Sequence, residues 1–253
     1  GNVLVYADMD QIESRMIAAL AGDERDLTAF REGRDIHAET ATMLFGRAFT
    51  DAVPEAKERI RDFSKRFRYA AQYGGGVVTV HETITSVEDD DGCFIYADRS
   101  LAEIRKIYNR FKRDHAPIFK WAGEQVRLWR REHYLTDCVL GRRRYFLDGE
   151  DEVSEMVNFP VQCPAAGLVH LALIDIRARC APGFAGPGTG IIHQGHDSIM
   201  LEVPEAMSVR VRDDLVECMT RRIPGLDVPF TASAKIVRRW SGDKIRAPVA
   251  VAA

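Results

Sequence analysis

The 253-residue sequence is poor in the features that mark membrane, secreted and repeat proteins. No apolar run approaches the roughly 20 residues needed to span a bilayer, and no signal-peptide pattern opens the chain. The five cysteines are scattered and form no C-x-x-C pair, which favours a reduced intracellular protein. Internal repeats and low-complexity linkers are also missing. We therefore expect no membrane segment, and either one large domain or two interlocked subdomains.

Net charge is small as well, because 35 Lys and Arg face 38 Asp and Glu. A formal charge of −3 argues weakly against a polyanionic partner. The distribution is uneven: the basic block at 99–145 holds 13 basic and 5 acidic side chains, between acidic runs at 88–91 and 148–152. Such a block fits a surface that follows a phosphate backbone, but it is also typical of a solvated helix face, and both interpretations stay open.

The sequence does contain a clear order of strand and helix patterns. β-Branched and aromatic residues predict strands, and apolar residues at helical spacing predict helices. Asp35 and Ser100 are expected N-caps, and Gly22 suits a helix C-terminus. The expected elements of the first half are a strand at 2–8 and helices at 12–21, 35–45, 54–73, 100–115 and 119–133.

The connecting segments are less regular. Residues 77–98 look like an irregular acidic insertion, and residues 136–148 suggest a hairpin or strand–turn. Pro160 and Pro164 are expected to bound a turn, after which residues 165–180 form an apolar helix. The strands lie far apart in the sequence with helices between them, so the fold class is α/β or α+β.

The strand at 2–8 ends in a dense group of carboxylates. Asp8, Asp10 and Glu13 fall within six positions. Acidic residues at the exit of a strand are suited to holding a hard cation through oxygen. The alternative is that Asp10 simply caps the helix that follows.

A second constellation lies on the predicted helix at 54–73. Arg61, Lys65, Tyr69 and Tyr73 follow at four-residue steps and form a slanting stripe roughly 18 Å long. Two cations at one end suit a triphosphate, aromatic rings toward the other suit a sugar and a base, and Gly74 permits close approach of a base or backbone. The alternative is a helix whose long side chains only alternate with its core face.

The third constellation is "HQGHDS". After a loop at 181–190, two short apolar runs meet at residues 195–197, which predicts a hairpin with Asp197 at its polar tip. Asp is also an ordinary turn residue. Taken with Asp8, however, it gives two carboxylates from distant strands that could clamp two Mg²⁺ ions about 4 Å apart for phosphoryl transfer.

These motifs resemble those of the family A DNA polymerases. "DMDQIESR" is similar to motif A (D-Y-S-Q-I-E-L-R), "RDFSKRFRYAAQYG" matches motif B (R-x-x-x-K-x-x-x-[FY]-x-x-x-Y-G), and "HDSIMLEVP" resembles motif C (H-D-E-L-V-L-E-V-P). "GRDIHAETATMLFG", "LGRRRYF" and "NFPVQCPAAGLV" also fit in the family's order, so the resemblance runs from Val3 to Asp243. It implies an α+β fold: a polymerase palm, in which helices pack on an antiparallel sheet, and a helical fingers subdomain.

The resemblance also implies a division of the chain. Residues 1–46 are the motif A strand of the palm and the start of the fingers, residues 47–135 are the fingers with the motif B helix at 54–73, and residues 136–253 are the palm with motif C. The thumb and exonuclease are expected to be absent.

Residue roles carry over from the motifs as implications of the resemblance. Asp8, Asp197 and the carbonyl oxygen of Met9 match the ligands of two Mg²⁺ ions, with Mn²⁺ as an alternative, and Asp8, Asp197 and Lys65 are the expected catalytic residues. Glu13 matches the steric gate that excludes a ribose 2′-OH, and Lys65 is a candidate proton donor to pyrophosphate. The implied dNTP contacts are Gln11, Glu13, His37, Arg61, Lys65, Tyr69 and Tyr73, and the implied DNA contacts are Arg142, Arg143, Asn158, Gln162 and His196.

The sequence departs from the family pattern near the expected metal site. Ser198 stands where an acidic residue usually follows the motif C aspartate, and Asp10 stands where the family usually has serine. We hypothesise that Asp10 partly compensates for the lost charge. Ser154 lies where a DNA-contacting arginine is common.

The family normally places a thumb, part of the palm and often an exonuclease before motif A. Because this sequence starts at the motif A strand, we expect a fragment, a processed product or one subunit of a divided polymerase. Its expected partners are primer–template DNA, dNTPs and another polypeptide that supplies the thumb and remaining palm, with an exonuclease as a further candidate. The expected location is the cytoplasm of a bacterium or a phage-infected cell.

Three other functions remain as alternatives. A single-subunit RNA polymerase shares the motif B spacing, but Glu13 argues against it. A two-metal nuclease also pairs aspartates, yet it has no use for the stripe from Arg61 to Tyr73. A non-catalytic nucleic-acid-binding or assembly subunit could keep the fold and lose turnover.

Overall fold

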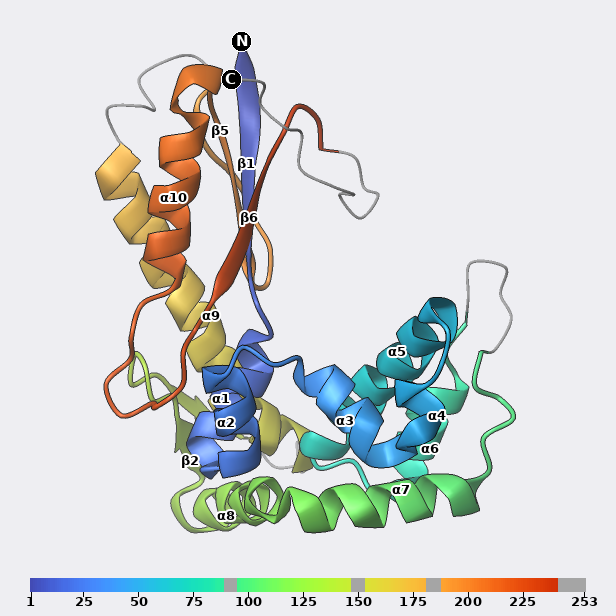
Figure 1. Ribbon diagram of the computed structural model, residues 1–253. Coiled ribbons are helices and arrows are strands. Elements are labelled where there is room, and N and C mark those ends of the chain that lie inside the picture. The colour runs from blue at the N-terminus through green and yellow to red at the C-terminus, as the bar shows by residue number, and fades with distance from the viewer. Residues whose placement is uncertain (89–94, 147–152, 181–187, 241–253) are drawn as a thin grey trace. The chain divides into compact units, whose positions relative to one another are not determined.

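The computed structural model describes residues 1–88, 95–146, 153–180 and 188–240 (Figure 1). The chain folds into two compact units. The first consists of Gly1–Met16, Asp137–Gly141 and Val161–Ala253, and the second of Ile17–Thr136 and Arg142–Pro160. An antiparallel sheet with packed helices confirms the expected α+β class.

The first unit is built on a four-stranded antiparallel sheet. Its strands in spatial order are β4 (Gly190–Gln194), β5 (Ser198–Pro204), β1 (Asn2–Met9) and β6 (Ala232–Val237). The predicted N-terminal strand is confirmed as β1, and the predicted hairpin as β4–β5. Strands from the two ends of the sequence therefore lie side by side, with β1 between β5 and β6.

Side chains of β1 alternate between two faces of the sheet. Val3, Val5 and Ala7 are buried, whereas Tyr6 and Asp8 between and after them are only half-buried. Helix α10 (Ser208–Met219) packs on β1 and β6, and it runs along one side of the sheet in Figure 1. The acidic end of β1 therefore belongs to the more polar face.

Helix α9 (Val153–Cys180) corrects one expectation. Pro160 and Pro164 were expected to bound a turn, but both lie inside this 28-residue helix. Both prolines are buried, so apolar packing outweighs the missing backbone donors. Arg179 of α9 also pairs with Glu217 of α10 at 2.7 Å, which places the two helices side by side.

By length and composition alone, α9 could cross a membrane. Within the described ranges it is the one helix that meets both criteria. Half of its most apolar stretch is buried inside the protein. One such helix is weak evidence for a membrane span, because the core helix of a soluble protein passes the same test.

The second unit is mainly helical. Helix α1 (Ile12–Ala21) leads into it from the first unit, and a small β2–β3 ladder joins Tyr134–Thr136 to Arg143–Tyr145. Its other helices are α2 (Glu24–Arg31), α3 (Ile36–Phe45), α4 (Arg47–Thr50), α5 (Pro54–Gln72), α6 (Val77–Thr85), α7 (Leu101–Asp114) and α8 (Ala116–Glu132). The structure thus confirms the predicted helices of this region and the predicted hairpin near residue 140.

Helix α6 was not expected, because residues 77–98 were predicted to be irregular. Val80 and Ile84 lie one turn apart on α6 and are fully buried in the cluster that also contains Phe63 and Phe67. Packing of this apolar stripe overrides the low helix propensity of its β-branched residues. Residues 89–94 and the greater part of the expected loop at 181–190 lie outside the described residues.

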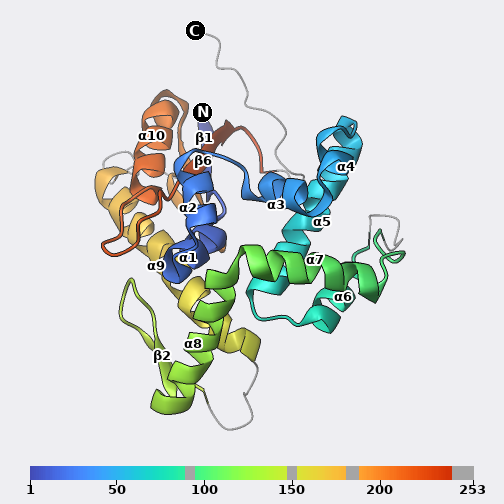
Figure 2. The same cartoon turned by 60° about the horizontal axis from the view of Figure 1, so that its bottom comes forward.

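Helix α5 has two faces that differ in character. Phe63, Phe67 and Ala71 are buried at four-residue spacing and pack with α3, α6 and α7, which surround α5 in Figure 2. Lys65 and Tyr69 follow Phe63 and Phe67 by two positions, which places them about 200° around the helix, on the opposite face. The core of the second unit therefore holds α5 so that its polar stripe points outward.

Candidate active site

Each unit carries its own group of predicted site residues. Those of the first unit are Asp8, Met9, Gln11, Glu13, Gln162, His196 and Asp197. Those of the second unit are His37, Arg61, Lys65, Tyr69, Tyr73, Arg142, Arg143 and Asn158.

In the first unit, sheet register brings Asp8 and Asp197 together. Asp8 pairs with Ser198 across β1 and β5, and the Met9 N–H donates to the Asp197 carbonyl oxygen at 2.9 Å. Burial, together with the neighbouring Asp197 carboxylate, raises the pKa of Asp8 to about 7. Oδ1 of Asp8 is also buried without a hydrogen-bond partner among the described residues. Two adjacent carboxylates and a buried, unsatisfied oxygen form an all-oxygen donor set that fits a hard divalent cation such as Mg²⁺.

Gly195 and Ser198 shape the tip of the β4–β5 hairpin. The Gly195 N–H donates to the Ser198 carbonyl oxygen at 2.9 Å, and a Cβ on Gly195 would lie 2.4 Å from Ser198 Oγ. A side chain at position 195 would therefore displace the Ser198 hydroxyl. The Ser198 hydroxyl hydrogen-bonds the Tyr6 hydroxyl.

Asp10 lies close enough to Asp8 to affect its pKa. Its Oδ1 accepts a hydrogen bond from Ser233 Oγ at 2.7 Å, and its negative charge contributes to the raised pKa of Asp8, whereas Lys235 lowers that pKa. Ser233 and Lys235 pair across the ladder with Asp8 and Tyr6. Sequence reasoning missed both β6 residues: alternation in "ASAKIV" places them on one face, but only the register shows which face.

Arg15 fixes the backbone that follows β1. Its Nε donates to the Asp10 carbonyl oxygen at 2.8 Å and its Nη1 to the Pro229 carbonyl oxygen at 2.5 Å, while burial lowers its pKa. Gln11, next to Asp10, has a left-handed φ of 53°, an uncommon conformation for a residue other than glycine. Arg15 was not predicted as a site residue, although the structure gives it this supporting position.

The structure brings the predicted steric gate and a predicted DNA contact together. Glu13 Oε1 lies 2.9 Å from His196 Nε2. The Glu13 side chain is 16% exposed, so His196 holds a carboxylate at the edge of the site. Gln162, on α9, is exposed, and Oε1 of Gln11 is buried without a hydrogen-bond partner among the described residues.

In the second unit, Asp35 links α3 to α5. It caps α3 by accepting from the His37 N–H at 2.8 Å, and it also accepts from Arg61 Nε at 2.5 Å. Although burial acts to raise its pKa, the bonds from Arg61 and the His37 N–H lower it. The guanidinium of Arg61 is thus held at the start of α3.

His37 is buried beside the stripe of α5. Its ring lies 5.7 Å from the ring of Tyr69, and neither ring nitrogen has a hydrogen-bond partner among the described residues. Burial lowers the pKa of His37 to about 4, and the charges of Arg61 and Lys65 add to this. The imidazole is therefore neutral at pH 7, with two polar atoms that a ligand could satisfy.

The end of α5 is shaped for close approach. Gly74 follows Tyr73 with φ of 85°, and a Cβ there would lie 3.3 Å from Val153 Cγ1. Lys65, one turn before Tyr69, is exposed and makes no ion pair within the described ranges.

The other predicted DNA contacts lie near the β2–β3 ladder. The Arg143 guanidinium stacks over the Tyr134 ring at 4.7 Å, and Arg142 directly precedes β3. Asn158, on α9, has a buried Oδ1 without a hydrogen-bond partner among the described residues.

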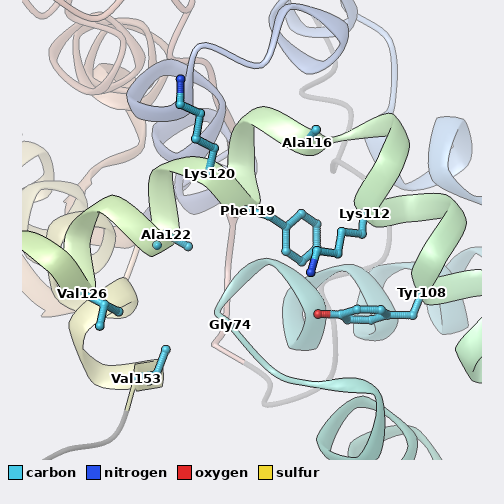
Figure 3. A pocket seen from close by; sticks show the side chains of 10 residues that line it. Gly74, Tyr108, Lys112, Ala116, Phe119, Lys120, Ala122, Val126 and Val153 are labelled. Atoms are coloured by element: carbon cyan, nitrogen blue, oxygen red, sulfur yellow. The ribbon is translucent and has the colours of Figure 1, made fainter.

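A cleft of about 480 Å³ lies within the second unit, between the end of α5 and helices α7 and α8 (Figure 3). The Lys112 amine points toward the rings of Phe119 and Tyr108, lying 5.6 Å from the Phe119 centroid, while Lys120 extends to the other side. Most of its lining residues belong to the basic block, and Gly74 and Val153 also line it. Aromatic and cationic side chains at one cleft suit an unpaired nucleotide.

Known proteins have sequences similar to this chain. DNA polymerase I of Thermus aquaticus, a thermostable enzyme, is 30% identical over 254 residues, covering 96% of this chain and 28% of its own length. DNA polymerase I of Mycobacterium leprae is 28% identical over 245 residues, covering 94% of this chain and 25% of its own length. The chain thus spans about a quarter of these relatives.

A solved structure agrees with the sequence relatives. The POL domain of Pol1 from M. smegmatis, in complex with DNA primer–template and dNTP, superposes with a TM-score of 0.77 and 26% identity, over 94% of this chain and 40% of that one. The sequence profile of DNA polymerase family A matches residues 1–242. The resemblance inferred from the motifs is confirmed, and the chain belongs to DNA polymerase family A.

Proposed function

We propose that this chain is the palm and fingers portion of a template-directed DNA polymerase, which adds deoxynucleotides to a primer 3′ end by phosphoryl transfer. One observation carries the proposal: in a member of DNA polymerase family A, Asp8 and Asp197 adjoin, and one Asp8 oxygen is buried without a partner. Burying such a carboxylate costs stability unless a cation neutralises it. The site is therefore built for a cationic ligand.

In this proposal Asp8, Asp197 and the Met9 carbonyl oxygen would hold two Mg²⁺ ions, with Mn²⁺ as an alternative. When bound, these ions stabilise negative charge on the attacking and leaving oxygens. Glu13 excludes a ribose 2′-OH, and the contact of its carboxylate with His196 supports a fixed position for this gate.

The second unit would bind the incoming nucleotide. Arg61 and Lys65 neutralise the triphosphate, and Lys65 donates a proton to the departing pyrophosphate. His37 acts as a neutral hydrogen-bonding group, because burial lowers its pKa. Tyr69 packs against the sugar, Tyr73 lies beside the templating base, and Gln11 completes the dNTP contacts.

Primer–template DNA would contact Arg142, Arg143, Asn158, Gln162 and His196. The relative from M. smegmatis was solved with DNA primer–template and dNTP, which supports these ligands. The thumb and remaining palm would come from another polypeptide or from more of the same chain, and an exonuclease is a further candidate partner. Relatives from bacteria support a cytoplasmic location.

Primer extension tests this proposal. The chain is assayed with Mg²⁺, with and without co-purifying partners, beside an Asp197→Ala variant, and with dNTPs against rNTPs. We expect deoxynucleotide addition that the substitution abolishes and that a partner strengthens. Extension that survives Asp197→Ala would exclude the assigned site, and robust processive synthesis by the isolated chain would exclude the need for a partner. A preference for rNTPs would favour an RNA polymerase.

The second candidate function is a non-catalytic nucleic-acid-binding or assembly subunit. The observation in its favour is Ser198. Its hydroxyl is hydrogen-bonded to Tyr6, whereas the motif C pattern has a further acid at this position. The same assay separates the two functions, because such a subunit would bind primer–template without extending it under any of these conditions.

A further inference from the structure

A buried arginine anchors the helix that carries the polar stripe. Arg68, on α5, is fully buried; its Nη1 donates to Thr40 Oγ1 at 2.9 Å and its Nη2 to the Asp26 carboxylate. Its guanidinium also lies over the ring of Phe111, 5.5 Å from the centroid. One side chain of α5 is thus bound to α2, α3 and α7.

A histidine and a second aspartate complete the network. His115 Nδ1 lies 3.1 Å from Asp23 Oδ2 and 3.8 Å from Asp26 Oδ1, and its ring packs on Phe111 at 4.5 Å. Asp23 is the N-cap of α2 and accepts from the Asp26 N–H at 3.2 Å. All four charged or titratable side chains, Asp23, Asp26, Arg68 and His115, are buried.

The Asp26 carboxylate of this network already has a cationic partner in the protein. Ligand atoms of Asp23, Asp26 and His115 lie within 4.8 Å of one another, as they do in metal sites. However, Arg68 occupies the Asp26 carboxylate, and although burial lowers the pKa of Arg68 to about 10, it remains charged at neutral pH. We therefore treat the cluster as a structural joint.

The joint acts where α3 meets the nucleotide-facing stripe. Thr40 lies one turn after His37 on α3, and Arg68 directly precedes Tyr69 on α5. The Arg68–Thr40 bond therefore fixes the register of the two helices at the level of the His37–Tyr69 ring contact. A second polar contact at these helices, Arg61 to Asp35, has side chains 40% and 36% exposed, so solvent weakens it.

We propose that Arg68 is a positioning residue for the incoming nucleotide: its buried bonds to Asp26 and Thr40 set how α5 presents Lys65 and Tyr69. The inference rests on the proposed function for its ligand, although the joint itself does not. A network that only stabilised the fold would leave nucleotide binding unchanged in a variant of normal stability. A positioning role predicts that such a variant binds nucleotide more weakly.

The test compares a double variant with the unaltered protein. Asp26→Leu with Arg68→Met removes both charges, so neither is left buried and alone, and the melting temperature should stay close to that of the unaltered protein. Binding of dATP with Mg²⁺, measured by calorimetry, should weaken about tenfold because Tyr69 and Lys65 are no longer held. Arg66→Met, which breaks the exposed Arg66–Asp62 pair on the same helix, is the control and should change neither quantity.

A readout without nucleotide keeps the two proposals apart. In protein with labelled His and Tyr, the His37 and Tyr69 rings should give a nuclear Overhauser effect that the double variant loses. If the double variant is stable and keeps both this effect and the dATP affinity, the positioning role is wrong. If the unaltered protein binds no dATP, the proposed function is wrong, while the ring contact still decides whether Arg68 positions Tyr69.

A milder variant covers the case in which the double variant does not fold. Thr40→Val keeps the shape of the side chain but removes the acceptor for Nη1. It should melt within a few degrees of the unaltered protein, weaken dATP binding about threefold and reduce the ring contact. An unchanged affinity and ring contact in a folded Thr40→Val protein would overturn the proposal.

Discussion

The two units each contain a group of acids, and the groups differ in how their charge is compensated. In the first unit the pKa of Asp8 is raised even though Lys235 is near. In the second unit the charge of Asp26 is compensated by Arg68, and Asp23 contacts the ring of His115, whose pKa is lowered by burial. Acids that lie together do not by themselves indicate a metal site. The informative quantity is the negative charge that the protein leaves uncompensated.

The largest expected effect comes from making the same substitution in both groups. Asp26→Asn leaves Arg68 buried with its charge unpaired, so the free energy of unfolding should fall by about 3–5 kcal/mol. Asp8→Asn removes a charge that burial and the Asp197 carboxylate disfavour, so the same quantity should be unchanged or rise by about 1 kcal/mol. Urea unfolding at pH 8 in EDTA measures both. Equal losses in the two variants would mean that the two groups do not differ in this way.

The second prediction concerns the stability of the protein at acid pH. Burial lowers the pKa of His37 in the folded state to about 4, below the 6.5 that is usual for histidine, so the folded state favours neutral imidazole. The unfolded chain therefore takes up the proton first, and the contribution of His37 to stability is complete above pH 6.5 and is lost as pH falls toward 4. The loss is at most about 3.5 kcal/mol, from roughly 1.4 kcal/mol per pKa unit over about 2.5 units.

Unfolding of His37→Gln measured between pH 8 and 4 isolates this contribution. The variant should lose less stability than the unaltered protein over that interval, and the difference should appear below pH 6.5. His115→Gln provides a comparison at a second buried histidine, because burial also lowers the pKa of His115. A pH profile that His37→Gln leaves unchanged would show that the ring is solvated.

Many of the elements compared here could be predicted from the sequence, but the balance of charge around the two groups of acids could not. Four-residue spacing predicted the stripe of α5, and β-branched and aromatic residues predicted a strand ending at Asp8, one residue before β1 ends. Arg68 lies within the same motif, yet a buried arginine and an exposed one look alike in sequence. Its partner Asp26 is 42 residues away, and only the packing of α2 against α3 and α5 brings them together.

Helix α6 and the prolines of α9 show the same limit in the prediction of local structure from sequence. Their sequences favour irregular backbone or a turn, and burial in a core that other elements complete makes them helical. The Asp8–Ser233 register likewise depends on the pairing of β1 with a strand more than 200 residues away.

A smaller effect is expected at Asp10, whose carboxylate we propose as a partial replacement for the acid missing at Ser198. Asp10→Ala should raise the Mg²⁺ concentration that gives half-maximal primer extension about tenfold, an effect of the size that residues behind metal ligands exert. Ser233→Ala removes the hydrogen bond to Asp10 but keeps its charge, so it should act more weakly. Unaltered catalysis and Mg²⁺ dependence in Asp10→Ala would end this hypothesis.

The smallest expected effect is on oligonucleotide binding, and it distinguishes the cleft from the basic block around it. Lys112 lines the cleft beside Phe119, whereas Lys106, also on α7 and exposed, does not. If the cleft binds an unpaired nucleotide, Lys112→Ala should weaken binding of a single-stranded oligonucleotide about threefold and reduce the slope of log affinity against log salt by about 0.7. Lys106→Ala should change both quantities less, because it loses only long-range attraction. Equal losses from the two substitutions would mean that DNA senses the charge of the whole block, and the cleft would then have no part of its own in binding.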